Sequence, residues 1–255
     1  MSFAACAGLV QRGDPDRFLA TMAAPLARRG PFFALYAFNL EVARAPWVTA
    51  ERMIAEMRLQ WWRDTVNEIG AQKQPRAHEV AQPLAEVITA HDLPLARIDA
   101  MIAARRWDIA KDAFADPAAL DSYLDATSGT LMWLAALTCG AAPVLEPAVR
   151  DVGYGLGVAN WLRAVPALAA QGRVPLLDGT DTGVAALAQR GLDRLGRARR
   201  TGFGAVVPAL LPAWQATTIL RQVVADPRRV GDETLGTSDF RRRGSLLIKS
   251  LTGRW

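Results

Sequence analysis

Apolar residues recur along the whole chain at intervals of three and four, and this spacing constrains the fold more than any other feature. Such intervals place side chains on one face of an α-helix. No stretch shows the sustained alternation of apolar and polar residues that a half-buried strand requires. The sequence therefore predicts an all-α protein. Because no internal repeat or low-complexity linker divides residues 1–255, we expect a single helical domain.

Residues that start and stop helices give the expected boundaries. Asp14-Pro15 predicts an N-cap followed by a proline at the first helical position, opening a helix that reaches about Arg29. Gly30-Pro31 is expected to break this helix, and Pro46 to end the next one. Further helices are expected over 49–70, 79–91, 95–113, 117–140, 147–171, 182–200 and 205–225. Thr49 is expected to cap the helix over 49–70, and Asp116-Pro117 to open the helix over 117–140.

Composition sets the broad class of protein. Apolar residues make up 51% of the 255 residues, which is enough for a large core, but no run approaches the ~18 residues of a membrane span. The N-terminus lacks the basic region of a secretory signal. Cys6 and Cys139 match no metal spacing, so we expect two free thiols in a reducing compartment.

The sequence contains few of the residues that several common kinds of active site need. His78 and His91 are the only histidines, which argues against a Ser-His or Cys-His nucleophile. The run GYGLG at residues 153–157 lies within a helical pattern and follows no strand, so it does not predict a dinucleotide site. Close packing of helices is the better interpretation of these glycines.

Paired carboxylates on helices are the residues that would hold Mg²⁺ against a diphosphate. Three such pairs occur, and each stands near a helix end or among arginine and lysine. We interpret them as solvated faces with local ion pairs, which are common and weak. The pairs are Asp64/Glu68, Asp108/Asp112 and Asp121/Asp125.

The stretch over residues 31–47 reads PFFALYAFNLEVARAPW and predicts a core helix. Tyr36, Leu40 and Ala43 share a face that is apolar apart from the tyrosine hydroxyl. Glu41 is the only carboxylate from residue 31 to residue 50. Tyr36 is expected either to line a cavity or to pack in the core.

Residues 36–47 of this stretch resemble the first motif of the squalene/phytoene synthase family. There, a Tyr-Ala-Phe-Cys-Arg run leads into an aspartate cluster of the DDxxD type. On that pattern, Asn39-Leu40 replace Cys-Arg, and the aspartate positions hold Ala43, Arg44 and Trp47.

The second motif of that family reads Asn-Ile-Leu-Arg-Asp, a second Asp, and then Gly-Arg, an aromatic residue and Leu-Pro. Residues 160–168 here read NWLRAVPAL, and residues 172–176 read GRVPL. Ala164 and Leu168 replace the aspartates, and no acidic residue occurs from 152 to 177. The positions that keep the family's residues are Asn160, Leu162, Arg163, Gly172 and Arg173.

The resemblance covers roughly residues 16–212 and implies an isoprenoid synthase helical bundle around a central cavity. It implies that Tyr36, Asn160, Arg163 and Arg173 contact a substrate, while no catalytic or metal-binding residue is expected. Loss of both aspartate sets removes the ions that activate an allylic diphosphate. Because Arg163 lies in an apolar stretch, we expect it to be buried and paired with a carboxylate such as Glu41 or Glu56, or with a bound anion.

Residues 37–41, 57–62 and 162–166 together resemble a divergent subgroup of this family, the assembly factors of mitochondrial respiratory complex I, which also lack the aspartates. This implies a non-catalytic protein, cytoplasmic or on the matrix side and peripheral to the inner membrane. It would assist assembly of a respiratory complex and could hold a lipid, an isoprenoid or a partner helix in the cavity. No cofactor is expected. Two alternatives stay open: an isoprenoid-binding protein, and an active prenyltransferase with Mg²⁺ held elsewhere, first at Asp64 and Glu68.

The C-terminal segment over residues 238–255 combines apolar and basic side chains. Its expected contacts with an anionic membrane or a protein partner are Arg241, Arg242, Arg243 and Lys249. The pattern is that of an interfacial membrane helix, and a plain docking tail is the alternative. No nucleic-acid-reading motif accompanies these cations, so we expect no nucleic-acid partner.

Overall fold

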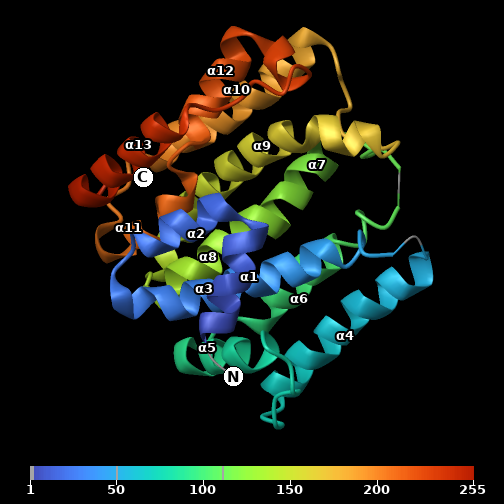
Figure 1. Ribbon diagram of the computed structural model, residues 1–255, viewed down its shortest axis with the longest axis vertical. Coiled ribbons are helices and arrows are strands. Elements are labelled where there is room, and N and C mark those ends of the chain that lie inside the picture. Colours follow the sequence, from blue (N-terminus) through green and yellow to red (C-terminus); the bar gives the residue numbers. More distant parts are fainter. Residues whose placement is uncertain (1–2, 50, 111) are drawn as a thin grey trace.

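The computed structural model describes residues 3–49, 51–110 and 112–255. These residues form α-helices joined by turns and short π or 3-10 segments, and no strand occurs in the ranges described. Figure 1 shows the helices stacked in an elongated bundle. The all-α prediction is therefore confirmed.

The first half of the chain builds one end of the bundle (Figure 1). The N-terminal helices α1 and α2 pack on α3, and α3 also contacts α4, α5 and α8. Their bounds are α1 Phe3–Gly13, α2 Pro15–Met22, α3 Leu26–Arg44, α4 Arg52–Gly70, α5 Ala81–His91 and α6 Leu95–Ala104.

The second half is organised around α9 (Glu146–Ala170), the longest helix with 25 residues. It runs between α8 and η1 on one side and α10 and α12 on the other (Figure 1). The remaining elements are α7 Pro117–Leu124, η1 Asp125–Gly129, α8 Thr130–Thr138, η2 Pro143–Leu145, α10 Asp181–Ala198, η3 Gly204–Val206, α11 Val207–Leu210, η4 Leu211–Ala213, α12 Ala216–Ala225, η5 Pro227–Val230 and α13 Asp239–Thr252.

The predicted break at Gly30-Pro31 is wrong. α3 runs through both residues, and the chain turns earlier, between Met22 and Leu26. Pro25 is the N-cap of α3 with an extended backbone, so this proline separates the helices. Pro31 is tolerated because it lies in the second turn of α3, where it removes only one intrahelical hydrogen bond.

Other boundaries also differ from the prediction. Helix α1 was not expected from the sequence, and the helix predicted over 95–113 ends at Ala104. Residue 111, within that predicted range, lies outside the described residues. The predicted caps at Asp14 and Asp116 are confirmed, since their carboxylates accept hydrogen bonds from backbone N–H groups three residues on. The predicted cap at Thr49 is wrong, because α4 begins at Arg52 and its N-cap is Glu51.

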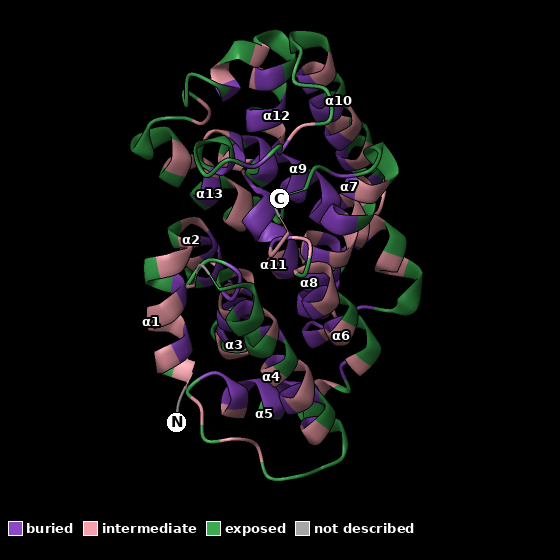
Figure 2. Ribbon diagram, turned by 90° about the vertical axis from the view of Figure 1, so that its right-hand side faces the viewer, coloured by how far each residue is buried: buried purple, intermediate pink, exposed green. Residues whose placement is uncertain are grey.

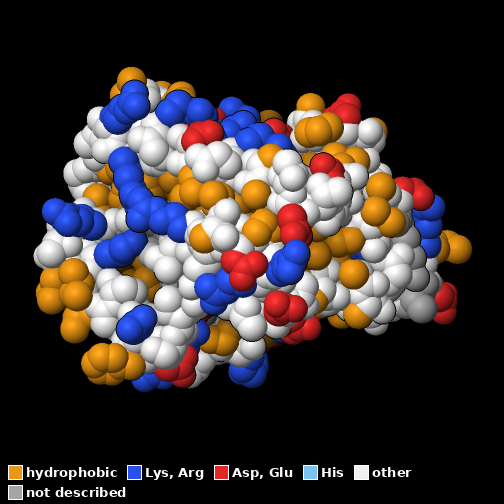
Figure 3. All heavy atoms as spheres, turned by 90° about the horizontal axis from the view of Figure 1, so that it is seen from above, with side chains coloured by type: hydrophobic (Ala, Val, Ile, Leu, Met, Phe, Trp, Pro, Cys, Tyr) orange, Lys and Arg blue, Asp and Glu red, His pale blue; other side chains and the backbone are white. Residues whose placement is uncertain are grey.

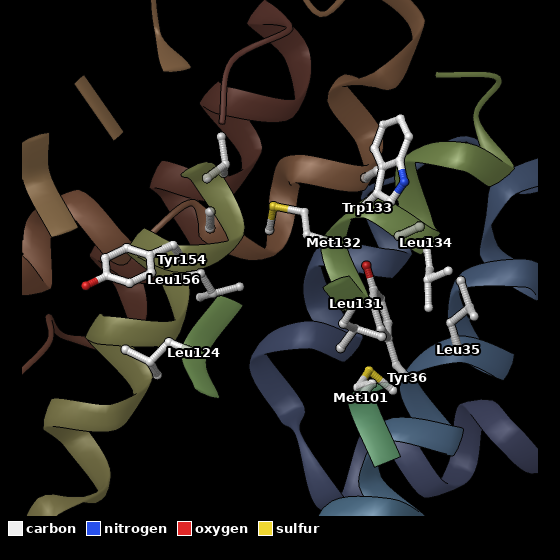
Figure 4. Packing of buried hydrophobic residues seen from close by; sticks show 14 of the residues in the cluster. Leu35, Tyr36, Met101, Leu124, Leu131, Met132, Trp133, Leu134, Tyr154 and Leu156 are labelled. Carbon is white, nitrogen blue, oxygen red and sulfur yellow. The ribbon is translucent and has the colours of Figure 1, made fainter. Parts of the chain in front are cut away.

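Almost every helix carries buried residues, as the colouring of Figure 2 shows. Tyr36 lies in this core near Met101 and Leu131 (Figure 4). Of the adjacent Trp61 and Trp62, only Trp62 is fully buried. None of the described helices combines the length and apolar content that a bilayer crossing needs.

Glycines on α9 allow its neighbours to approach closely. A Cβ atom on Gly153 would lie 2.7 Å from the Cα of Gly129 in η1. A Cβ atom on Gly155 would lie 2.5 Å from Cγ of Leu195 in α10. Such distances are shorter than any relaxed carbon–carbon contact. The interpretation of residues 153–157 as helix-packing glycines is confirmed.

Candidate functional site

The two segments that resemble the family motifs face each other across one cavity of about 260 Å³. Ala43 and Trp47 line it from the end of α3 and the turn that follows. Ala164 and Leu168 line it from the C-terminal half of α9. The fold therefore brings together two segments that lie about 120 residues apart in the sequence, as the motif pattern requires. Neither segment carries the aspartates of the family motifs.

The cavity has carboxylates of its own, and arginines neutralise them. Of the residues that line it, Asp14 and Asp108 are the acids. Asp14 pairs with Arg17 at 2.8 Å, and Asp108 pairs with Arg105 at 3.3 Å. All four side chains line the cavity, so its formal charge is balanced without any bound cation.

Asp108 belongs to a buried hydrogen-bonded cluster. It is 3% exposed and accepts a hydrogen bond from the Tyr123 hydroxyl at 2.9 Å. Arg105 donates to that hydroxyl at 2.7 Å and to the Asn39 side-chain oxygen at 3.4 Å. Burial raises the pKa of the Asp108 carboxyl, and burial also raises the pKa of the Tyr123 hydroxyl. The cluster therefore stabilises a closed wall of the cavity.

Aromatic rings fill the space beside this cluster. Trp107 and Phe114 stack with their ring centroids 3.9 Å apart. Tyr123 and Trp161 pack against both rings at centroid distances of 5.5–5.7 Å. Trp161 also donates from its indole N–H to the Pro175 carbonyl at 2.9 Å. These contacts fix the rings and limit the size of the cavity.

The residues in the cavity do not fit the magnesium ions that the family fold implies. Mg²⁺ prefers carboxylate and water oxygens, whereas Ala43, Ala164 and Leu168 offer none. Arg17 and Arg105 would repel a cation at the same place. Across the described ranges, no group of three or more His, Cys, Asp or Glu side chains is arranged to hold a metal ion.

The carboxylate pairs picked out from the sequence are also engaged elsewhere. Glu68 receives two hydrogen bonds from Arg76, at 2.7 and 2.8 Å, which lower its pKa. Asp64 accepts from Gln60 at 2.8 Å on the same exposed face. The prediction of a solvated face is wrong for Asp108, which the fold buries because Arg105 and Tyr123 satisfy its oxygens.

The third pair, Asp121 and Asp125, lies at α7 and η1. The Asp121 carboxylate accepts from the Tyr154 hydroxyl on α9, and the Asp125 carboxylate accepts from Arg150. Both acids thus attach these elements to α9. Neither lines the cavity between the motif segments.

Of the predicted substrate contacts, Asn160 lines the cavity and Tyr36 does not. Tyr36 is 2% exposed and lies behind the cavity wall, with the Arg17 guanidinium 5.1 Å from its ring centroid. Asn160 is exposed and also lines a neighbouring cavity of about 250 Å³. The structure thus places Tyr36 in the core.

The two predicted arginines differ in burial. Arg163 is 43% exposed and pairs with Asp16 at 3.2 Å, so the expected burial and the partners Glu41 and Glu56 are wrong. It lies on the outer side of α9, because Trp161, Leu162 and Val165 occupy the inner side. Arg173 is buried, donates to the Ala110 carbonyl at 2.8 Å and also donates to the carbonyl of Asp108.

The C-terminal cations do not all face outward. Arg242 pairs with Asp16 at 2.7 Å, and the Lys249 ammonium donates to the Trp214 carbonyl at 2.7 Å. Both side chains therefore hold α13 against the domain. Arg241 and Arg243 are exposed.

Sequence reasoning missed Asp16 and Arg105, which connect distant elements. Asp16 also accepts from Gln215 at 2.9 Å, so four segments of the chain meet at one carboxylate. Arg105 stands three residues before Asp108, a helical spacing that signals an ion pair. Nothing in the sequence near Asp16 points to its partners, because they lie more than 140 residues away.

The geometry defines an isoprenoid synthase-type helical bundle in which the described residues that line the central cavity form no metal-binding set. The model of the family described as squalene/phytoene synthase matches residues 10–177. The chain belongs to the squalene/phytoene synthase family. Both predicted motif segments, residues 36–47 and residues 160–176, lie within that match. The match therefore includes every position at which an aspartate of the motifs is replaced.

Relatives of this chain include NADH dehydrogenase (ubiquinone) complex I, assembly factor 6. The protein from Bos taurus is 28% identical over 162 residues, which are 63% of this chain and 48% of that protein. The one from Homo sapiens is 27% identical over the same shares. The homolog from Drosophila melanogaster is 28% identical over 68% of this chain and 53% of its own length. The chain thus spans about half the length of these relatives.

Solved structures with the same fold include two synthases. A dehydrosqualene synthase in complex with ligand superposes with a TM-score of 0.68 at 14% identity, covering 98% of this chain and 95% of that one. Squalene synthase HpnC from Alicyclobacillus acidocaldarius gives a TM-score of 0.64 at 18% identity, covering 98% and 94%. At these identities the likeness establishes the fold alone.

Proposed function

We propose that this chain is a non-catalytic member of the squalene/phytoene synthase family that assists assembly of respiratory complex I. The observation that carries the proposal is the cavity between α3 and α9. Its two motif segments present Ala43, Trp47, Ala164 and Leu168, and its own acids are paired with arginine. Chemistry that begins by ionising a prenyl diphosphate needs metal ions at this place.

The relatives support the choice of partner. Proteins named complex I assembly factor 6, or its homolog, match this chain in five organisms, over about half of their own length. We extend their role to this chain as a proposal, with a subunit of the respiratory complex as the partner. The place of action would be the cytoplasmic or matrix face of the inner membrane, with the chain peripheral to the bilayer.

A second role as an isoprenoid carrier would need room for a lipid in the cavity. The cavity measures about 260 Å³ and shares Asp14, Arg17 and Asn160 with the neighbouring cavity of about 250 Å³. Extraction of the purified protein with organic solvent, followed by mass spectrometry, tests this point. A stoichiometric prenyl lipid in the extract would show that the cavity opens in solution.

Deletion of the gene in its host tests the assembly role. We expect less fully assembled complex I on native gels and lower NADH oxidation by membranes, both restored by the wild-type gene. An unchanged amount of complex I would refute the proposal.

A second complementation separates assembly from catalysis. The variant Asp64→Asn/Glu68→Gln removes the acids that a prenyltransferase would recruit first in place of the missing motifs. Because the proposed assembly role does not use these two acids, this variant should restore complex I as well as the wild type does. Failure of a stably folded variant to do so would favour the enzyme.

A further inference from the structure

The outward face of α13 is apolar, which is the reverse of an ordinary surface helix. Phe240, Leu247 and Leu251 recur at helical spacing and are 88%, 59% and 78% exposed. Ile248 beside them is 63% exposed. These four residues form a stripe along the solvent side of the helix, which we call the α13 stripe.

The opposite side of α13 is firmly docked, so the orientation of the α13 stripe is fixed. Leu246 is buried in a small cluster with Leu211 and Trp214. Arg242 and Lys249 add the contacts to Asp16 and the Trp214 carbonyl described above. The helix therefore buries one face against the domain, and the α13 stripe lies on the face that remains exposed to solvent.

Cations border the stripe on both sides. Consecutive helical residues differ by about 100° around the axis, which places Arg241 and Arg243 on opposite edges of the α13 stripe. Both are exposed. The single acid of α13, Asp239, pairs with Arg242 at 3.1 Å near the docked side. The outward surface is thus apolar in the middle and positive at its edges.

A basic pocket of about 810 Å³ opens at the C-terminal end of the same helix. It is lined by Arg199, Lys249 and Arg254, and by the rings of Phe203 and Trp255. None of the described lining residues is acidic. Arg199 donates to the Thr217 hydroxyl at 2.8 Å.

No acidic side chain of the described residues forms an ion pair with Arg199, Lys249 or Arg254 in this pocket. Burial and the nearby Arg199 lower the pKa of Lys249 to about 8. By contrast, Arg194 and Arg197 in the preceding turn pair with Asp151 at 3.5 and 3.1 Å. Figure 3 shows Lys and Arg side chains gathered beside hydrophobic ones toward the left end of the molecule, the side on which Figure 1 places α13.

We propose that the α13 stripe and the basic pocket together bind an anionic phospholipid bilayer. The stripe would enter the boundary between headgroups and acyl chains. The phosphate of one lipid would be held by Arg199, Lys249 and Arg254. Apolar burial combined with cations is what an interfacial helix uses on anionic membranes, and each basic residue near such a surface strengthens the attraction.

Flotation with vesicles tests this binding. The purified chain should float with vesicles of equimolar phosphatidylcholine and phosphatidylglycerol, and not with phosphatidylcholine alone. High salt should weaken the binding, because it screens the cations. Vesicle binding requires neither complex I nor turnover, so its outcome is independent of the proposed assembly role.

Variants locate the surface. Leu247→Ser/Leu251→Ser and, separately, Arg241→Gln/Arg243→Gln should each weaken binding to the mixed vesicles about tenfold or more. The matched control is Met53→Ser/Met57→Ser on α4, which removes two methionines that are 74% and 64% exposed. It should bind like the wild type. All the changed side chains are exposed, and circular dichroism checks that each variant is folded.

Three results would overturn the proposal. One is equal binding to neutral and anionic vesicles. Another is undiminished binding of the α13 variants. The third is a change in oligomeric state on altering the stripe without any loss of vesicle binding, which would make this face an interface between copies of the chain.

The variant Arg254→Gln tests the basic pocket. Its binding to mixed vesicles and its binding to inorganic phosphate are each compared with those of the wild type. Weaker vesicle binding supports a lipid site, while an effect on phosphate binding alone contradicts it.

Discussion

The Asp16 carboxylate on α2 accepts a hydrogen bond from the Arg242 guanidinium on α13, with 2.7 Å between the oxygen and the nitrogen. The same carboxylate accepts from Arg163 on α9 and from Gln215 just before α12. One side chain near the start of the chain thus fixes the position of its last helix. The exposed stripe of α13 depends on this contact for its orientation.

Replacing Asp16 should therefore destabilise the protein. Asp16→Ala removes an acceptor shared by three donors, and we expect a loss of about 1–3 kcal/mol in the free energy of unfolding. Urea denaturation measures it. Asp239→Asn is the matched control, because Asp239 is 78% exposed and pairs with the same Arg242. The control should change stability by less than about 0.5 kcal/mol. Equal losses in the two variants would show that Asp16 has no special role.

Replacing glycine by alanine is expected to have opposite effects on stability at Gly153 in α9 and at Gly196 in α10. In Gly153→Ala the new methyl group meets the backbone of Ser128 and Gly129, so we expect a destabilisation of about 1–3 kcal/mol. In Gly196→Ala nothing lies within 4 Å, and the position is exposed and helical. Alanine there should stabilise the protein by about 0.5–1 kcal/mol. Thermal unfolding compares the two. A neutral Gly153→Ala would mean that η1 and α9 are not in close contact.

The buried cluster around Asp108 predicts that removing a single hydroxyl group, that of Tyr123, lowers the stability of the protein. Tyr123→Phe leaves Asp108 and Arg105 without their shared partner, at an expected cost of about 1–3 kcal/mol. Tyr36→Phe is the control, since the Tyr36 hydroxyl makes no hydrogen bond to the described residues and the ring is equally buried. Chemical denaturation of both variants checks this. A larger loss for Tyr36→Phe would contradict the structure.

The pKa of Lys249 makes stability depend on pH. It is lowered from 10.5 to about 8 by burial and by Arg199. Between these values the unfolded chain binds more protons at this site, so this group makes stability rise as the pH increases from about 8 to 10.5.

Lys249→Met should remove that rise, and the difference between wild-type and variant denaturation midpoints across the window measures it. Cys6 and Tyr154, with pKa values that burial raises to about 11 and about 12, work in the opposite direction. They do so in both proteins and cancel in the difference. Identical pH profiles would show that Lys249 is not perturbed.

How far the sequence predicts the structure depends on whether the signal is local. The caps at Asp14 and Asp116 and the packing role of residues 153–157 follow from neighbours within a few positions, and the structure confirms them. Gly30-Pro31 is also a local signal, but the preceding Pro25 ends the helix first and leaves Pro31 near the start of α3.

The candidate site could be predicted only in part for the same reason. The absence of acids at Ala43 and Ala164 is readable from the sequence, and the fold brings both positions to one cavity. The exposure of Arg163 was missed because α9 is apolar on nearly every side from Val152 to Ala159, so the pattern does not reveal which side faces solvent. The pairing of Asp16 depends on helices that meet only in the folded chain.

The most direct test of the central claim is diphosphate release. The purified chain is incubated with farnesyl or geranylgeranyl diphosphate over a range of Mg²⁺ concentrations, beside an active squalene synthase as the positive control. Because the cavity pairs its own acids with arginine and its described lining residues form no metal-binding set, we predict a rate equal to that of the protein-free reaction at every Mg²⁺ concentration. Diphosphate release that is proportional to the amount of this protein and abolished by a chelator would contradict the account.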